Sequence, residues 1–326
     1  MSRKFVSAIT FLALSAMPLG AFAQDVASGI APAAWGKKAE MLEPNSEFAT
    51  AELGGKIYVL GGYPAGRVTV KTVQIYDIRS DRWTLGPPLP EPNNHGMVAV
   101  VDNVLYLIGG QTDPQRAYVD TVYALDAQAG QWIEKARMPT KRSAGVALAL
   151  DGKIYVAGGR PPHGHVFEVY DPKADRWETL RDLPSQRNHI AGAVIGGKIA
   201  IAGGRLEGGF QSDKTAAFEA YDPKTGDWSK LAPMPRARSG INGVMAYGCF
   251  HVWGGEHADG MFPDHDYYDP RQNQWSKLAD MPTPVHGVTG ATFSDGLIWV
   301  TGGGISKGGS SGTLLNQVYR PEVRCE

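Results

Sequence analysis

The sequence has little cysteine and no excess of charge of either sign. Cys249 and Cys325 are the only cysteines among 326 residues, so only one intramolecular disulfide can form. Lysine and arginine number 32 against 33 acidic residues, and the net charge is −1. This balance gives no electrostatic basis for binding nucleic acid or an anionic membrane surface. After the N-terminal segment, no apolar run is long enough to span a bilayer.

The N-terminal segment has the features of an export signal. Arg3 and Lys4 precede a mostly apolar stretch, and Ala21-Phe22-Ala23 then supplies a small-x-small cleavage site. A retained membrane helix is the alternative, but the apolar stretch is short and is broken by proline and glycine. We therefore expect a signal peptide at 1–23 and a mature domain at 24–326. The mature protein should be periplasmic or secreted, in a compartment where a disulfide persists.

Glycine is abundant, and part of it recurs with a regular period. Each of six Gly-Gly pairs ends a short apolar, strand-like run, as in Lys56-Ile57-Tyr58-Val59-Leu60. Internal repeats with a period of roughly 50 residues, as here, are typical of propellers and solenoids. The pairs are Gly61-Gly62, Gly109-Gly110, Gly158-Gly159, Gly203-Gly204, Gly254-Gly255 and Gly302-Gly303.

A second signal follows five of these pairs. An aspartate stands six residues before a tryptophan each time, with turn-forming residues between them. The tryptophan begins an outer strand and can pack between neighbouring sheets. The pairs are Asp77 and Trp83, Asp126 and Trp132, Asp171 and Trp177, Asp222 and Trp228, and Asp269 and Trp275.

Together these signals resemble the Kelch repeat over about residues 35 to 319. The resemblance implies an all-β protein, a six-bladed Kelch β-propeller with four strands in each blade. The sixth repeat ends without its tryptophan, whereas Trp35 stands alone near the N-terminus. We therefore expect the N-terminal strand to complete the last blade, which would hide the two edges of an open ring.

Strand direction predicts which residues share a face. The residues that open each inner strand and those directly after each Gly-Gly pair should converge on one rim of the central channel. Arginine suits carboxylate or phosphate groups, so this rim predicts an anionic or polyhydroxylated, carbohydrate-like ligand. In the alternative interpretation the arginines satisfy backbone carbonyls between blades. The predicted ligand-binding residues are Arg142, Arg160, Arg187, Arg205, Arg238, Asn94 and Asn188.

Histidines open the inner strands of alternate blades. His95, His189 and His286 would lie around the axis with three-fold symmetry, an arrangement that suits zinc or copper with an open coordination position. The alternative is that each histidine bonds a neighbouring blade. Glu256 directly follows a Gly-Gly pair and is the candidate general base, with His189 as a second catalytic residue. A structural salt bridge from Glu256 to Arg205 or Arg238 is the competing interpretation.

Several functions fit the resemblance, which extends to protein-interaction modules, galactose oxidase and periplasmic sialic-acid mutarotases. We rank binding of a small polar or anionic ligand first. A sugar mutarotase or epimerase, a metal-dependent enzyme with three histidines, and a protein-interaction scaffold stay open, as does whether the chain is an enzyme at all. We expect a monomer that contacts neither nucleic acid nor, after signal cleavage, membrane. Cys249 and Cys325 should share the face opposite the site, where a disulfide would tether the C-terminus.

Overall fold

Each of the first five repeats folds into an antiparallel four-stranded meander. The computed structural model describes residues 26–64, 66–113 and 117–326, so the expected signal peptide lies outside the described residues. Blade 1 runs outward from the channel in chain order. Its strands are β2 (Phe48–Leu53), β3 (Lys56–Leu60), β4 (Val73–Asp77) and β5 (Arg82–Leu85).

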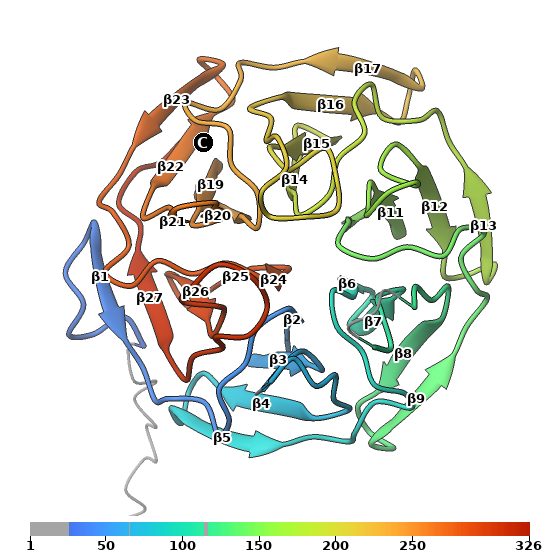
Figure 1. The fold of residues 1–326 in the computed structure, drawn as a ribbon. Helices are drawn as coiled ribbons and strands as arrows, with labels where there is room; N and C mark the ends of the chain where they lie inside the picture. The colour runs from blue at the N-terminus through green and yellow to red at the C-terminus, as the bar shows by residue number, and fades with distance from the viewer. Residues whose placement is uncertain (1–25, 65, 114–116) are drawn as a thin grey trace, which may run out of the picture.

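Three further blades repeat this order without interruption, which the ring in Figure 1 shows. Blade 2 holds β6 (Met97–Val101), β7 (Val104–Ile108), β8 (Val122–Asp126) and β9 (Gln131–Glu134). Blade 3 holds β10 (Val146–Leu150), β11 (Lys153–Ala157), β12 (Phe167–Asp171) and β13 (Arg176–Thr179). Blade 4 holds β14 (Ala191–Ile195), β15 (Lys198–Ala202), β16 (Phe218–Asp222) and β17 (Asp227–Lys230).

Blades 5 and 6 depart from this strand arrangement. Blade 5 holds β18 (Asn242–Ala246), β19 (Cys249–Trp253), β22 (His265–Asp269) and β23 (Gln274–Lys277), with a small hairpin of β20 (Glu256–His257) and β21 (Gly260–Met261). In blade 6 the inner strand is split into β24 (Val288–Thr289) and β25 (Thr292–Ser294), followed by β26 (Leu297–Thr301) and β27 (Asn316–Arg320). Because β24 pairs in parallel with β2, it joins the last blade to the first.

The turns explain why each run ends where it does. Gly54 and Gly55 connect β2 to β3 with φ of 62° and 77°, the left-handed values that two-residue hairpin turns require. At the outer hairpin, Asp77 Oδ1 accepts a hydrogen bond from the Ser80 N–H at 2.9 Å. Asp thus begins the turn that leads to the tryptophan strand.

The N-terminal strand closes the ring, as predicted. β1 (Ala34–Lys37) pairs antiparallel with β27, and blade 6 has the order β1-β27-β26-β25. Trp35 then donates from Nε1 to the Ala279 carbonyl at 3.0 Å, across 244 residues of chain. The other outer-strand tryptophans make the same bond to the preceding blade linker: Trp83 to Ala39, Trp132 to Pro87, Trp177 to Ala136, Trp228 to Arg181, and Trp275 to Ala232.

A disulfide joins Cys249 to Cys325, which confirms the predicted pairing. The S–S distance is 2.08 Å and the two residues are 76 positions apart. The Cys325 N–H also donates to the Tyr247 carbonyl at 2.8 Å, so the C-terminal segment is held against blade 5. Covalent closure of a long loop stabilises a fold chiefly by restricting its unfolded chain.

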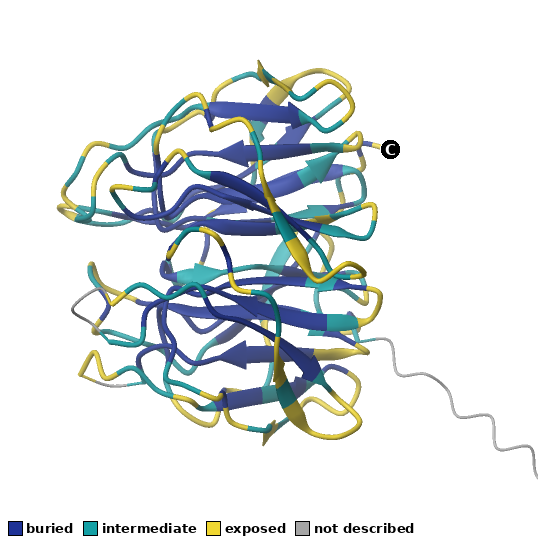
Figure 2. Cartoon of the chain, turned by 90° about the vertical axis from the view of Figure 1, so that its right-hand side faces the viewer, coloured by how far each residue is buried: buried dark blue, intermediate teal, exposed yellow. Residues whose placement is uncertain are grey.

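The core lies between the blades. Figure 2 shows buried strands throughout the ring and exposed residues mainly at its rims and outer turns. Tyr76 of blade 1, for example, is fully buried and packs on both Trp83 and Trp299 of the neighbouring blade 6. The structure describes no helix long and apolar enough to cross a membrane.

Candidate functional site

One residue at the opening of each inner strand forms a ring around the channel. All six ring residues have a left-handed backbone, with φ between 50° and 69°. Backbone hydrogen bonds join successive members of the ring: the amide of one ring residue donates to the carbonyl of the ring residue in the preceding blade. His95 donates in this way to Glu47 at 2.8 Å, and His189 donates to Ala144 at 2.8 Å. The ring residues are Glu47, His95, Ala144, His189, Gly240 and Gly287.

Side chains are retained in this ring where glycine would be less strained. A left-handed backbone costs roughly 1–2 kcal/mol in an ordinary L-residue, and strained residues of this kind concentrate at functional sites. Gly240 and Gly287 adopt the conformation freely. Glu47, His95 and His189 adopt it with bulky polar side chains, which makes the rim they form a candidate site.

The expected equivalence of His286 with His95 and His189 is wrong by one residue. Gly287 occupies the ring position, whereas His286 pairs with Gly304 in the same way that Asn94 pairs with Gln111. Blade 6 carries one extra residue before its Gly-Gly pair, and this shifts the register.

Sequence reasoning missed Glu47 as the third polar member of the ring. Glu47 stands 14 residues before Gly61, the same step that separates His95 from Gly109 and His189 from Gly203. Counting back from each Gly-Gly pair would have found it.

An asparagine contacts Nδ1 of His95, and a second asparagine contacts Nδ1 of His189. His95 Nδ1 lies 2.5 Å from Asn94 Oδ1, and His189 Nδ1 lies 2.6 Å from Asn188 Oδ1. Asn188 donates through Nδ2 to two backbone carbonyls, of Arg205 and Glu207, which orients Oδ1 toward the ring. At His189 this places the proton on Nδ1 and leaves the Nε2 lone pair to accept from arginine, whereas Nε2 of His95 faces both Arg160 and a carboxylate oxygen of Glu47.

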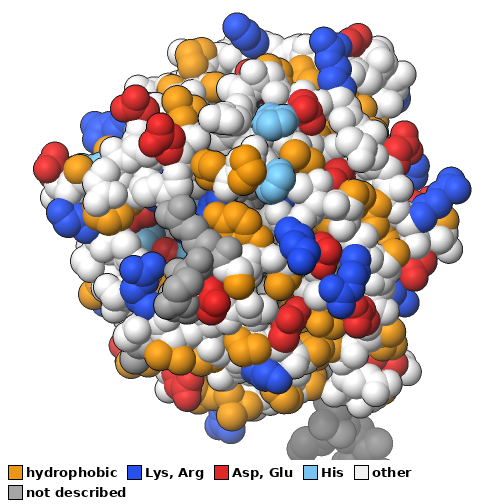
Figure 3. All heavy atoms as spheres, turned by 45° about the vertical axis from the view of Figure 1, so that its right-hand side comes forward, with side chains coloured by type: hydrophobic (Ala, Val, Ile, Leu, Met, Phe, Trp, Pro, Cys, Tyr) orange, Lys and Arg blue, Asp and Glu red, His pale blue; other side chains and the backbone are white. Residues whose placement is uncertain are grey.

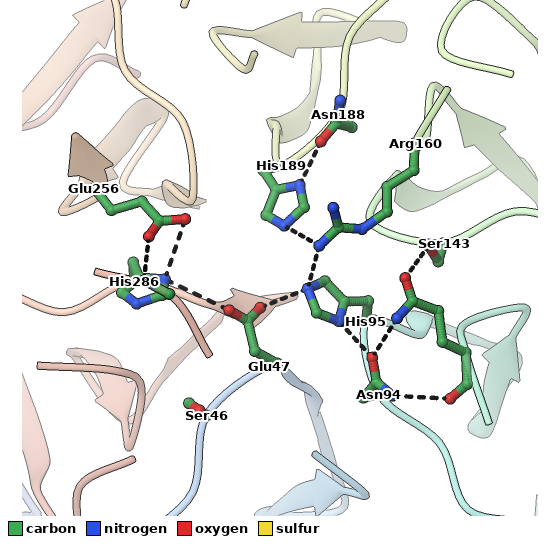
Figure 4. Close-up of polar contacts among 12 residues, drawn as sticks. Ser46, Glu47, Asn94, His95, Ser143, Arg160, Asn188, His189, Glu256 and His286 are labelled. Carbon is green, nitrogen blue, oxygen red and sulfur yellow. Dashed lines mark hydrogen bonds and ion pairs between the residues drawn. The ribbon is translucent and has the colours of Figure 1, made fainter. Parts of the chain in front are cut away.

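Two arginines of the rim contact the Nε2 atoms of these histidines. Arg160 Nη2 lies 3.0 Å from His95 Nε2 and 3.4 Å from His189 Nε2 (Figure 4). Arg205 Nη2 lies 2.7 Å from His189 Nε2, and its Nη1 donates to Glu256 Oε1 at 2.7 Å. Both arginines directly follow Gly-Gly pairs, so the predicted convergence of the two residue sets on one rim holds for them.

Two carboxylates and His286 complete the cluster. Glu47 Oε2 lies 2.9 Å from His95 Nε2, and Glu47 Oε1 lies 3.7 Å from His286 Nδ1. Glu256 Oε1 lies at the same 3.7 Å from that nitrogen. Figure 4 shows these contacts as one chain of side chains from several blades, running across the channel mouth.

Burial controls the charge states of the cluster. It lowers the pKa of His95, with Arg160 adding to the effect and Glu47 opposing it. Burial also lowers the pKa of His189 well below its ordinary range, helped by Arg205 and Arg160. Burial alone would raise the pKa of Glu47, but His95, His286 and Arg160 hold it well below its usual value. At neutral pH Glu47 is therefore ionised, and burial favours the neutral forms of His95 and His189.

The other three predicted arginines lie inside their blades. Arg142, Arg187 and Arg238 have no exposed surface, and each pairs with a carboxylate of its own blade. Arg187 also donates to the carbonyls of Gly203, Ala217 and Ile201. These three arginines satisfy backbone carbonyls, as in the alternative interpretation, but they do so within one blade and not between blades. Their partners are Glu168, Glu219 and Asp266, in the same order.

A pocket opens directly over the cluster. Its volume is ≈ 240 Å³, and Tyr63, Arg67, Gln111 and Phe210 line it. The members of the cluster that line it are Glu47, His95, Arg160, Arg205 and Glu256. Four glycines from the loops of blades 4 and 6 also line it, and their lack of side chains leaves room for a ligand. A second hollow of ≈ 360 Å³ lies along the inner strands, lined mainly by alanine, valine and glycine. The polar pocket is the better candidate because its charged groups converge on one space.

The repeat is now supported by sequence comparison as well as by fold. Residues 47–240 match the KLHDC2/KLHL20/DRC7 Kelch-repeats domain, which is more than half of the chain. The chain belongs to the Kelch-repeat family.

Kelch-like protein 36 of Mus musculus is 42% identical over 57 residues, 17% of this chain and 9% of that protein. Kelch-like protein terF of Aspergillus terreus is 41% identical over 71 residues, 21% of this chain and 16% of that protein. The matched part of this Kelch chain thus spans less than a fifth of these relatives.

Among solved structures, that of YjhT superposes with a TM-score of 0.70 at 17% identity. The match covers 85% of this chain and 96% of that one. At this identity the likeness establishes the propeller fold, and the chemistry of the site must be argued from its own residues.

Proposed function

We propose that this Kelch propeller binds a small, anionic, carbohydrate-like molecule in the pocket at the channel mouth. One observation carries the proposal. Two guanidinium groups, Arg160 at 8% and Arg205 at 3% exposure, are held beneath a polar pocket instead of extending into solvent. Buried arginine is costly unless it is paired, and these two contact histidines, the Glu256 carboxylate and the Gly208 carbonyl while they face the pocket.

The remaining lining suits a hydroxylated ring. Tyr63 and Phe210 supply aromatic surface, and Gln111 supplies an amide. A planar guanidinium binds a carboxylate through two parallel hydrogen bonds, which gives the pocket a preference for acidic over neutral ligands. Arg67, also at the pocket wall, adds a third positive charge from blade 1. On the face that Figure 3 shows, charges of both signs are interspersed, so that face offers no extended surface of one charge for an anionic ligand.

The test compares two sugars that differ at one carbon, which is a carboxylate in one and a hydroxymethyl group in the other. We expect glucuronic acid to bind at least ten times more tightly than glucose in calorimetric titration. Arg205→Gln should weaken the binding of the acid at least ten-fold and leave the affinity for glucose little changed. Arg181→Gln is the matched control, because Arg181 is exposed and its guanidinium pairs, among the described residues, with Asp227 at the outer edge. Equal affinity for both sugars, or equal losses in the two variants, would contradict the proposal.

Export belongs to the same proposal. The N-terminal segment carries the features of a signal peptide, and the Cys249–Cys325 disulfide suits an oxidising compartment. We expect the mature chain to begin at Gln24 and to fractionate with the cell envelope or the medium. Mass spectrometry of the protein purified from each fraction tests this, and an intact chain starting at Met1 in the cytosol would exclude it.

A further inference from the structure

The central channel continues below the ring residues as the second hollow. Its volume of ≈ 360 Å³ exceeds that of the polar pocket, and the inner strands of all six blades line it, around the centre of Figure 1. Of its lining residues, Thr50 and Val146 lie close to the ring residues in the chain and are buried, whereas Ala149 at the hairpin end of β10 is exposed. The hollow therefore opens to solvent on the face opposite the polar pocket.

The ring residues close the inner end of the hollow. A void of only ≈ 10 Å³ separates the two, and it is lined by Glu47, His95 and His189 of the ring and by Ile190 of the hollow. A space of this size holds at most about one water molecule. A larger solute cannot pass between the described side chains here, so it enters the hollow from the far face. The hollow and the polar pocket are thus separate sites.

The wall of the hollow is apolar on one side and partly polar on the other. Every lining residue from blades 2, 3 and 4 is aliphatic or glycine. The polar lining side chains come from the adjoining blades 5, 6 and 1, and they are Thr50, Glu52, Asn242 and Thr292. Exchange of water for apolar ligand surface against an aliphatic wall is favourable. This division favours a ligand with an apolar body and one polar edge.

Two buried hydroxyl groups face the hollow from neighbouring blades. Thr50 and Thr292 are each 4% exposed, and neither Oγ1 atom has a hydrogen-bond partner among the described residues. Side chains alternate between the two faces of a strand. Because Ala51 packs toward blade 2 and Phe293 toward blade 5, the two threonines lie on the sides of blades 1 and 6 that face each other. A polar group of a ligand between these blades offsets the cost of burying both hydroxyls.

The other two polar side chains of the wall already have hydrogen-bond partners. Asn242 Nδ2 donates to the Gly290 carbonyl, and its Oδ1 accepts from the Gly243 N–H at 2.9 Å. Glu52 Oε1 accepts from the Gly55 N–H at 2.6 Å, at the hairpin end of the hollow. Among the described residues no lysine or arginine lines the hollow, so its wall offers an anion no positive partner. The hollow therefore favours a neutral ligand, unlike the polar pocket.

We propose that the hollow binds one compact, neutral molecule with an apolar body and a hydroxyl group, such as an aromatic alcohol. The aliphatic wall of blades 2 to 4 contacts the apolar body, and Thr50 and Thr292 exchange hydrogen bonds with the hydroxyl. The volume of the hollow lies in the range of about 300–1,000 Å³ that is usual for small-molecule pockets. An apolar cavity of about 150 Å³ already holds benzene, so a bicyclic alcohol fits here. The site is independent of the proposed sugar binding.

The test is a calorimetric titration of the full mature chain with 2-naphthol and with naphthalene, which has the same rings without the hydroxyl. We expect 2-naphthol to bind at one molecule per chain. The double variant Thr50→Val with Thr292→Val keeps the shape of both side chains and removes their hydroxyls. The ratio of 2-naphthol affinity to naphthalene affinity should therefore be at least about ten-fold higher in the wild type than in the double variant. An equal ratio in the two proteins overturns the proposal.

A substitution at the mouth of the hollow tests where the probes bind. Ala149→Trp places an indole at the exposed end of the hollow and should abolish the binding of both probes. Ala174→Trp is the matched control, because Ala174 is exposed in the outer turn of the same blade, and it should bind both. Circular dichroism confirms that each variant is folded.

Glucuronic acid separates the two proposals. Its binding in the polar pocket should be unchanged in Ala149→Trp, so either site can fail without the other. Absence of 2-naphthol binding by the wild type would mean that the hollow holds only water, and it would overturn the proposal. Retention of 2-naphthol by Ala149→Trp would place the probe elsewhere and overturn it as well.

Discussion

Arginines are buried both at the channel rim and inside the blades, but they make different contacts in the two places. In blade 4, Arg187 donates to three carbonyls and to Glu219, all within its own sheet. At the rim, Arg160 reaches from blade 3 to histidines of blades 2 and 4. Burial of charge therefore does not by itself mark a functional site. The distinction is whether the charge is satisfied by one sheet or shared between blades beneath a pocket.

Removing one arginine of each kind tests whether rim and blade-interior arginines differ in their contribution to stability. Arg187→Ala should lower the free energy of unfolding by about 3–5 kcal/mol, because it leaves Glu219 buried without its partner. Arg205→Ala should cost only about 1–2 kcal/mol, since water entering the pocket can solvate Glu256. Denaturant unfolding of the two variants beside the wild type measures both values.

Ligand binding should respond in the opposite order. Arg205→Ala should abolish the preference for an acidic sugar, whereas Arg187→Ala should retain it at temperatures where that variant is folded. Burial lowers the pKa of Arg187 to about 10, opposed by Glu219, so it stays charged at neutral pH in the wild type. If the two variants lose equal stability, the proposed division between rim and blade interior is wrong.

Buried histidines allow a second comparison. In blade 5, His251 Nδ1 lies 3.1 Å from His265 Nε2, with Trp35 and Tyr319 against the pair. Burial lowers the pKa of His251 from 6.5 to about 4, and burial together with His251 lowers that of His265. Neither imidazole faces a carboxylate or an arginine at hydrogen-bonding distance among the described contacts, unlike His95 at the rim.

This pair should make the fold sensitive to acid. Below pH 6.5 the unfolded chain takes up a proton on His251 that the folded chain refuses, so stability falls as the pH falls. At about 1.4 kcal/mol per pH unit, the loss through His251 is roughly 2 kcal/mol by pH 5. Urea unfolding at pH 7 and pH 5 measures it. His251→Phe should flatten this dependence, whereas His165→Gln should not; equal slopes in all three proteins would rule out the pair as the cause.

Much of the fold was predictable because the same short sequence signals recur in each blade. Six Gly-Gly pairs in phase with five Asp-to-Trp steps determined the blade number, and the missing last tryptophan predicted closure by Trp35. Strand direction placed Arg160, Arg205 and Glu256 on one rim. It also placed Cys249 and Cys325 close enough to bond. These inferences need only the order and direction of strands, which the repeat supplies.

The finer errors come from single-residue register. Arg187 and His189 are two positions apart, yet one side chain enters its blade and the other lines the channel. The inserted residue in blade 6 moves His286 out of the ring, and composition gives no sign of it. Pairing of Arg187 with Glu219, 32 residues away, depends on side-chain packing that the repeat pattern does not encode.

A glycine substitution in the ring tests whether its left-handed backbone is strained. Ala144 lies in the ring with φ of 57°, whereas Ala147 lies in β10 of the same blade, and both are buried. Replacing either by glycine removes a buried methyl group and adds chain entropy to the unfolded state, at a cost of roughly 1–2 kcal/mol. At Ala144 the relief of left-handed strain returns about 1 kcal/mol or more. We therefore expect Ala144→Gly to be nearly neutral and Ala147→Gly to be clearly destabilising in parallel thermal unfolding. Equal destabilisation would mean that the ring carries no strain, and the retention of Glu47, His95 and His189 there would lose its physical significance.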